Sequence, residues 1–233
     1  MPQNLPKSIS VSTFTYLLSY LFPQLLAKVS SPLNPVLEVR LSRGRLRLDS
    51  GNSTYSYEDL YDTFYSPFKK LNVSERPFNK VLVLGSGLCS IPFMLQKHFR
   101  QHAQYTVVDI DEMVIHLARQ FVLPEVLENI TFHCADAFDF VAEDNELYDL
   151  IAVDVFIDTN TPSKFRSASF LENLKRRLSS DGLIIYNTMV NHEDLSRVSN
   201  AFYRSTFKQT FPDGFAIRTS GNRVLVYDTR KNQ

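Results

Sequence analysis

Val81-Leu-Val-Leu-Gly-Ser-Gly-Leu-Cys-Ser-Ile91 is the stretch of sequence that decides the fold. Its first four residues form an apolar run that is too short for a helix and is typical of a parallel strand covered on both faces. Gly85 and Gly87 then permit a tight turn and a close approach of a ligand to the main chain, and residues 91–99 carry apolar side chains at helical spacing. The stretch therefore predicts a notch that fits a phosphate or a nucleoside, although Gly-x-Gly also occurs in purely structural turns.

An acidic residue follows the glycines at the distance that a strand, a helix and a second strand require. Residues 104–109 read as the second strand, and Asp109 ends it. A carboxylate at this position can accept the hydroxyl hydrogens of a ribose, and it repels a phosphate. Asp111 fits the N-cap of the next helix better than Asp109 does. We therefore expect Asp109 to lie beside the notch.

The composition is that of a globular chain without a charge bias. With 233 residues, 44% of them hydrophobic, the chain can bury the core of one main domain plus an appendage. Its 25 basic and 25 acidic side chains cancel, so there is no global electrostatic reason to expect a nucleic-acid partner. The two cysteines, Cys89 and Cys134, show neither a paired nor a metal-ligand spacing. We expect reduced thiols, a cytoplasmic protein and no metal.

The first third of the chain predicts an appendage, residues 1–72, ahead of a nucleotide-binding domain, residues 73–233. Apolar residues at three- and four-residue steps between residues 14 and 29 predict an amphipathic helix that packs on the core or, alternatively, against a second subunit in a homodimer. Pro23 and several polar residues argue against a membrane span. Residues 36–49 predict a β-hairpin around Gly44, residues 51–57 a further strand, and residues 57–65 a helix that ends before Pro67.

From residue 80 onwards strands and helices alternate, which is typical of a doubly wound parallel sheet. The expected strands are 80–84, 104–109, 130–134, 148–154 and 182–187, with helices between them. The last two strands surround Ser220-Gly-Asn222, a tight hairpin, so the final strand must run antiparallel to its partner. The predicted fold is α/β: a Rossmann-like, mostly parallel seven-stranded sheet with an antiparallel C-terminal hairpin.

Two further acids follow later strands of this sheet. Asp136 follows the third strand and Asp154 ends the fourth. Because the carboxyl ends of parallel strands face one crevice, both should meet Asp109 there, although Asp136 could also simply cap the next helix. Gly-x-Gly, the acids and the final hairpin together resemble the S-adenosylmethionine-dependent methyltransferase superfamily.

Three segments narrow the resemblance. Val108-Asp-Ile-Asp-Glu-Met-Val-Ile115, Ala135-Asp-Ala-Phe138 and Tyr148-Asp-Leu-Ile-Ala-Val-Asp154 are similar to the spermidine synthase (polyamine aminopropyltransferase) family. The resemblance implies that Asp109 holds the ribose and Asp136 reads the adenine of S-adenosylmethionine or of its decarboxylated form. It implies that Asp154, supplemented by Asp158, orients and helps deprotonate an attacking amine. The implied nucleotide site comprises Gly85, Ser86, Gly87, Asp109, Ile110, Asp136 and Ala137.

The chain departs from the family pattern at two places. The family's Gly-Gly-Gly-Asp-Gly-Gly type loop, whose aspartate grips the amine of the decarboxylated cofactor, is Gly85-Ser-Gly-Leu-Cys-Ser90 here, and Asp154-Val-Phe-Ile-Asp158 replaces Asp-Ser-Ser-Asp-Pro. Nearby, Tyr57 and Tyr61 are expected as apolar walls with polar tips, and Glu58 and Asp59 as ordinary polar surface.

Three functions remain open from the sequence. The first is transfer of an aminopropyl group to an amine, the second is methyl transfer from intact S-adenosylmethionine to a small molecule, and the third is a binding or scaffold role without turnover. All three predict a small-molecule ligand, with no nucleic acid and no membrane as partner.

Overall fold

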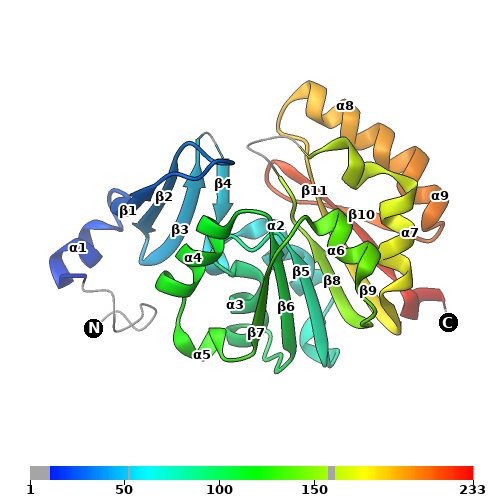
Figure 1. The fold of residues 1–233 in the computed structure, drawn as a ribbon, viewed down its shortest axis with the longest axis horizontal. Helices are drawn as coiled ribbons and strands as arrows, with labels where there is room; N and C mark the ends of the chain where they lie inside the picture. Colours follow the sequence, from blue (N-terminus) through cyan, green and yellow to red (C-terminus); the bar gives the residue numbers. More distant parts are fainter. Residues whose placement is uncertain (1–10, 52, 157–160, 233) are drawn as a thin grey trace.

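The computed structural model describes residues 11–51, 53–156 and 161–232. Figure 1 shows a large sheet with helices on both faces and a smaller sheet at the N-terminal side. The small sheet has the order β1-β2-β3-β4, with β1 Gln24–Val29, β2 Leu37–Ser42, β3 Arg45–Ser50 and β4 Ser53–Ser56. The large sheet has the order β10-β11-β9-β8-β5-β6-β7, with β5 Lys80–Leu84, β6 Gln104–Asp109, β7 Ile130–Cys134, β8 Tyr148–Val153, β9 Leu178–Met189, β10 Phe215–Arg218 and β11 Asn222–Asp228.

Helices connect the strands of the large sheet and lead into it. The α-helices are α1 Thr13–Leu18, α2 Asp62–Lys70, α3 Ser90–Lys97, α4 Glu112–Phe121, α5 Pro124–Leu127, α6 Ala137–Glu143, α7 Ala168–Arg176, α8 Glu193–Phe202 and α9 Lys208–Thr210. Short 3-10 helices are η1 Glu58–Leu60, η2 Val73–Glu75, η3 Ser163–Arg166 and η5 Thr229–Asn232, and η4 Tyr203–Phe207 is a π-helical turn between α8 and α9.

The strand directions confirm the predicted seven-stranded sheet. β5 pairs in parallel with both β6 and β8, β6 pairs in parallel with β7, and β8 with β9. β11 pairs antiparallel with both β9 and β10, as the hairpin at Ser220-Gly-Asn222 requires. The chain therefore reverses its strand order around β5, which is where ligands bind in open sheets of this kind.

Alternate residues of the central strand pack on opposite faces. Val83 belongs to a core shared with Phe64 and Phe68 of α2, whereas the adjacent Leu82 belongs to a core shared with Phe170 of α7. These side chains are completely buried, and each stabilises the fold by roughly 1.5–3 kcal/mol relative to exposure. Burial on both faces explains why β5 has an apolar run instead of an alternating pattern.

The small sheet packs against the first helices of the large sheet. Leu37 and Leu48 of the hairpin share a core with Leu117 and Phe121 of α4. The predicted hairpin at residues 36–49 and the following strand are both confirmed, as β2, β3 and β4. The predicted domain boundary between residues 72 and 73 stays a prediction.

The predicted N-terminal amphipathic helix is wrong over most of its length. Helix α1 covers only Thr13–Leu18 and has no buried residue, and residues 24–29 form strand β1, which pairs antiparallel with β2. Pro23 lies between them, where its missing N–H and its ring disfavour a continuous helix. The apolar residues then serve a half-buried strand.

The helix that was expected to end before Pro67 continues to Lys70. Pro67 is buried inside α2 between Phe64 and Phe68, and the Leu71 N–H donates to its carbonyl at 2.9 Å. Packing of this face on the core outweighs the hydrogen bond that proline cannot make, which costs roughly 3 kcal/mol in an exposed helix.

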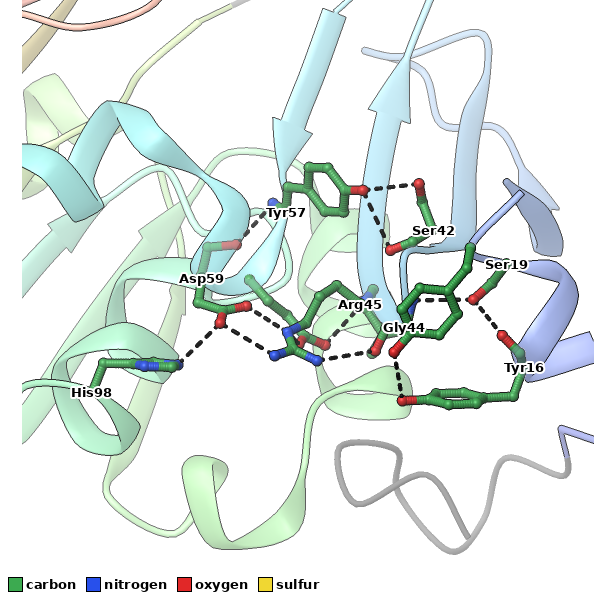
Figure 2. Close-up of polar contacts among 12 residues, drawn as sticks. Tyr16, Ser19, Ser42, Gly44, Arg45, Tyr57, Asp59 and His98 are labelled. Carbon is green, nitrogen blue, oxygen red and sulfur yellow. Dashed lines mark hydrogen bonds and ion pairs between the residues drawn. The ribbon is translucent and has the colours of Figure 1, made fainter. Parts of the chain in front are cut away.

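Polar contacts tie the hairpin turn to its neighbours, as Figure 2 shows. The Gly44 N–H donates to Ser19 Oγ at 3.0 Å, and a Cβ at Gly44 would lie 2.6 Å from the Tyr20 hydroxyl. Arg45 Nε lies 2.5 Å from Asp59 Oδ1, and His98 Nε2 of the α3 C-terminus lies 3.3 Å from Asp59 Oδ2. These contacts hold η1 in place just ahead of Tyr61.

Candidate functional site

A pocket of about 290 Å³ lies at the carboxyl ends of the parallel strands. Six of the predicted nucleotide-site residues line it: Gly85, Gly87, Asp109, Ile110, Asp136 and Ala137. Asp154 lines it as well, whereas Asp158 lies outside the described residues. The connection between β1 and β2 also contributes to the wall, through Asn34, and so does β4, through Tyr55. The pocket is thus a cleft between the two sheets, and its size approaches that of typical ligand sites.

The two glycines are needed for close packing of the chain on itself. Gly85 has φ +95°, and a Cβ there would lie 2.2 Å from the carbonyl oxygen of Asp154. Gly87 has φ +46°, and a Cβ there would lie 2.8 Å from Cβ of Ser56 in β4. Side chains at both positions would therefore push apart the strand ends and the two sheets. The predicted contact of this backbone with a nucleotide stays a prediction.

Asp109 is bonded to the turn that carries these glycines. Its Oδ2 accepts from the Ser86 N–H at 2.8 Å and from Ser86 Oγ at 2.9 Å, and its Oδ1 accepts from the Asp111 N–H at 2.9 Å. Because Ser86 is buried and donates two of these hydrogen bonds, it fixes the orientation of the Asp109 carboxylate. Burial raises the pKa of Asp109, and the three donors oppose that rise. Since each carboxylate oxygen can accept about two hydrogen bonds, Oδ1 keeps acceptor capacity for a hydroxyl group.

Asp136 caps helix α6 and also lines the pocket. Its Oδ1 accepts from the Phe138 N–H at 2.9 Å, which is the helix-capping role that the sequence left open. Its Oδ2 forms an ion pair with Lys164, a residue of η3 that no sequence pattern indicated as part of the site. The capping bond leaves one carboxylate oxygen for the pocket, and Lys164 shares it.

Asp154 is held by donors from two other elements. Tyr61 donates to Oδ2 at 3.0 Å, and Asn187 Nδ2 of β9 donates to Oδ1 at 2.8 Å. Asn222 Nδ2 in turn donates to Asn187 Oδ1 at 2.8 Å and so fixes the orientation of that amide. Burial raises the pKa of Asp154 to about 6, the two donors oppose the rise, and the charge of Asp109 adds to it. A carboxylate with this pKa can exchange a proton near neutral pH.

Asn34, in the connection between β1 and β2, forms hydrogen bonds with two other residues that line the pocket. Asn34 Nδ2 donates to Asp111 Oδ2 at 2.6 Å, and Asn34 Oδ1 accepts from the Tyr55 hydroxyl at 2.8 Å. The sequence did not select Asn34, because the contact joins residues 77 positions apart. Asn187 could have been found, because it lies near the carboxyl end of the fifth parallel strand, where the other site residues were sought.

Two residues that the sequence analysis considered, one at the glycine turn and one before Tyr61, have structural roles. Cys89 is buried in the turn, and burial raises the pKa of its thiol, which disfavours the thiolate that a nucleophile requires. Glu58 was expected on the surface, but only 4% of it is exposed, because it lies beneath the hairpin and accepts from the Leu46 N–H at 3.0 Å. Within residues 11–51, 53–156 and 161–232, no group of three or more His, Cys, Asp or Glu side chains could hold a metal ion. No helix in these ranges is long and apolar enough to span a membrane.

Comparison with known proteins identifies relatives for most of the chain. The family model described as the spermine/spermidine synthase domain matches residues 71–233. A polyamine aminopropyltransferase of Vibrio vulnificus (strain CMCP6) is 28% identical over 182 residues, which cover 74% of this chain and 60% of that protein. The chain thus spans less than two thirds of the length of this relative.

Solved structures share the fold. A protein described as a probable spermidine synthase from Corynebacterium glutamicum ATCC 13032 superposes with a TM-score of 0.71 at 18% identity, over 87% of this chain and 79% of that one. Human methyltransferase-like protein 13, solved in complex with SAH, has a TM-score of 0.53 at 26% identity, over 67% of this chain and 73% of that one. The large sheet therefore has the architecture of both groups of proteins.

Proposed function

Because this chain belongs to the spermine/spermidine synthase family, we propose that it transfers an aminopropyl group from decarboxylated S-adenosylmethionine to an amine. The observation that carries the proposal is the position of Asp154. This carboxylate lies in the same pocket as Asp109 and Asp136, its pKa is about 6, and Tyr61 and Asn187 fix its orientation. An acceptor amine needs a base of this kind.

The pocket suits the nucleoside part of such a donor. Asp109 Oδ1 has acceptor capacity for a ribose hydroxyl, and Asp136 Oδ2 can accept from the amino group of an adenine. Four aspartates line the pocket within the described residues, namely Asp109, Asp111, Asp136 and Asp154, and Lys164 is paired with one of them. This negative lining favours a ligand with a cationic sulfonium.

The reaction needs a positioned base and little else from the protein. The lone pair of the acceptor amine attacks the carbon next to the sulfonium, the bond between that carbon and sulfur breaks, and its electrons stay on sulfur as methylthioadenosine leaves. Before this attack the ammonium of the acceptor gives a proton to Asp154, whose carboxylate is ionised above its pKa of about 6, and the loss of the proton frees the lone pair. The same carboxylate attracts the cationic acceptor and aligns its nitrogen.

The glycine turn should bind the donor's amine more weakly than the loop of the family pattern does. Leu88 occupies the fourth place of the loop, where that pattern has aspartate, and it is buried in the core with the small sheet. The donor's amine therefore has no loop carboxylate to bind. This departure favours a second candidate function, methyl transfer from intact S-adenosylmethionine. The similarity to human methyltransferase-like protein 13 favours it as well.

Product analysis separates the candidates. The full chain is incubated with putrescine or spermidine and with either decarboxylated or intact S-adenosylmethionine, and the products are identified by mass spectrometry. Aminopropylated amine and methylthioadenosine in equal amounts support the proposal. A methylated acceptor supports the second candidate. Binding of methylthioadenosine by calorimetry without turnover of either donor contradicts both and leaves the scaffold role.

A further inference from the structure

Lys164 is the pocket residue whose role the proposed reaction does not explain. Its ammonium pairs with Asp136 Oδ2 and lies 5.8 Å from the ring centre of Phe138 and 5.3 Å from that of Phe165. Two aromatic faces and a carboxylate thus hold the cation at the pocket wall. Its side chain is 42% exposed, against 19% for that of Asp136, so part of the ammonium faces open space.

The hydrogen-bonding capacity of this pair exceeds what residues 11–51, 53–156 and 161–232 use. An ammonium has three donors, and the contact with Asp136 takes one of them. Oδ2 of Asp136 has two lone pairs, and Lys164 takes one, while Oδ1 is engaged by the Phe138 N–H. Among the residues that the structure describes, a free acceptor site and free donors therefore lie side by side at one end of the pocket.

An adjacent acceptor and donor match one edge of a 6-aminopurine. The amino group of such a base is a donor, and each ring nitrogen next to it, N1 or N7, is an acceptor. A base whose amino group bonds to Asp136 Oδ2 brings one of these nitrogens towards the neighbouring ammonium. Without such a donor, Asp136 would form a hydrogen bond with the amino group only.

We propose that Lys164 is a second base-recognition residue, which donates to a ring nitrogen beside the amino group while it stays paired with Asp136. The inference rests on the proposed function, since it takes the nucleoside as the ligand of this pocket. It makes Lys164 a specificity-determining residue for the donor and for the methylthioadenosine that leaves.

Calorimetry with three nucleosides tests this role. Methylthioadenosine, its 7-deaza analogue and its 1-deaza analogue are titrated into the full chain and into Lys164→Met. We expect one of the two analogues to bind the unaltered chain about tenfold more weakly than methylthioadenosine, because a charge-assisted hydrogen bond is lost. Lys164→Met should bind methylthioadenosine about tenfold more weakly and should no longer distinguish it from that analogue.

Lys97→Met is the matched control, because Lys97 also pairs with an acid, Glu125, but on the exposed surface of α3 and α5. It should leave all three affinities unchanged. The comparison of nucleosides on the unaltered chain needs no variant, so equal affinities would overturn the role of Lys164 even if Lys164→Met fails to fold.

The other outcomes are distinct. Equal affinity of the unaltered chain for all three nucleosides overturns the role of Lys164 and leaves the proposed function standing. Tighter binding of methylthioadenosine by Lys164→Met also overturns it, because the ammonium would then compete with the base. Failure of the unaltered chain to bind any of the three overturns both the inference and the proposed function.

Discussion

The Tyr61 hydroxyl lies 3.0 Å from Oδ2 of Asp154, so the segment that leaves the small sheet donates directly to the carboxylate at the end of β8. The two residues are 93 positions apart, and both line the pocket. The same carboxylate accepts from Asn187 on its other oxygen. Asp154 is therefore oriented before any ligand arrives, which is what a general base requires.

Asp154→Asn should slow transfer by roughly two to four orders of magnitude while methylthioadenosine still binds. The amide has nearly the same shape as the carboxylate but cannot accept the proton of the acceptor amine, and loss of a general base typically costs 10²- to 10⁴-fold in rate. The kcat/KM for the acceptor and the Kd of methylthioadenosine are measured. Asp213→Asn, at an exposed position, is the control. Full activity in Asp154→Asn would remove this residue from the chemistry.

The acid limb of the activity profile should report the ionisation of Asp154. With a pKa of about 6, the carboxylate is protonated and inactive as the pH falls through that value. The Tyr61 hydroxyl stabilises the ionised form, so Tyr61→Phe should raise the pKa and shift the acid limb to higher pH. The pH dependence of kcat is measured for both proteins. An unchanged limb in Tyr61→Phe would show that another group controls it.

Glu58 should make the fold less stable as the pH rises. Burial raises its pKa to about 8 from an ordinary value of 4.5, so the folded state holds the proton more firmly than the unfolded state does. Stability from this group is therefore complete below pH 4.5 and is lost as the pH rises from 4.5 to 8. Within the described residues Oε2 has no hydrogen-bond partner, and its ion pair with Arg45 Nε, at 3.6 Å, offsets only part of the effect of burial.

Glu58→Gln tests this linkage, because the amide keeps an acceptor for the Leu46 N–H and has no charge. The free energy of unfolding is measured in urea at pH 5 and at pH 9, and its decrease between these pH values should be smaller for the variant than for the unaltered chain. The two decreases should differ by up to about 1.4 kcal/mol for each unit by which the pKa of Glu58 is raised. Glu128→Gln, at an exposed position, should fall as the unaltered chain does. If the free energy of unfolding of Glu58→Gln decreased between pH 5 and pH 9 as much as that of the unaltered chain, ionisation of Glu58 would not be the cause of the decrease.

The sequence predicted those parts of the molecule that local pattern and strand topology determine. The apolar run at Val81, the acids that end or follow strands and the tight hairpin at Gly221 suffice for the large sheet and for the shared pocket. Contacts over long distances had no local signal. Asn34 and Lys164 reach the pocket only because the small sheet and η3 fold against it.

Tertiary packing also overrode local signals at the N-terminal side. Residues 24–29 have apolar side chains at spacings that fit a helix, but pairing with β2 and the position of Pro23 make them a strand. Glu58 looked like surface because a charged residue seldom becomes buried, yet the hairpin covers it. Neither outcome could be predicted without knowing which elements pack together.

The donor's amine should add little to binding in this chain. Leu88 is buried where the family pattern has the aspartate that grips the amine, and a charge-assisted hydrogen bond of that kind contributes about 1.5–3 kcal/mol. Decarboxylated S-adenosylmethionine and methylthioadenosine should therefore bind with Kd values within about tenfold of each other. Calorimetry with Asp154→Asn, which prevents turnover, gives both values. A donor that binds a hundredfold more tightly would reveal another group that holds its amine.

The apolar surface around α1 should be covered by a second copy of the chain. Phe14, Leu17, Leu21 and Phe22 are 61–73% exposed, and they lie within nine residues at one end of the small sheet. Clustered large apolar side chains of this kind are typical of protein interfaces, and a homodimer buries the same patch on both copies.

Light scattering coupled to size-exclusion chromatography gives the mass in solution, for which we expect twice the 26.8 kDa of one chain. Leu17→Ser with Leu21→Ser should shift the dimer towards the monomer, because both changes remove apolar area from the centre of the patch. Val198→Ser, at an exposed apolar residue of α8 far along the chain, should leave the dimer intact. A monomer at all concentrations of the unaltered chain, or a dimer that survives both serines, would exclude this surface as the interface.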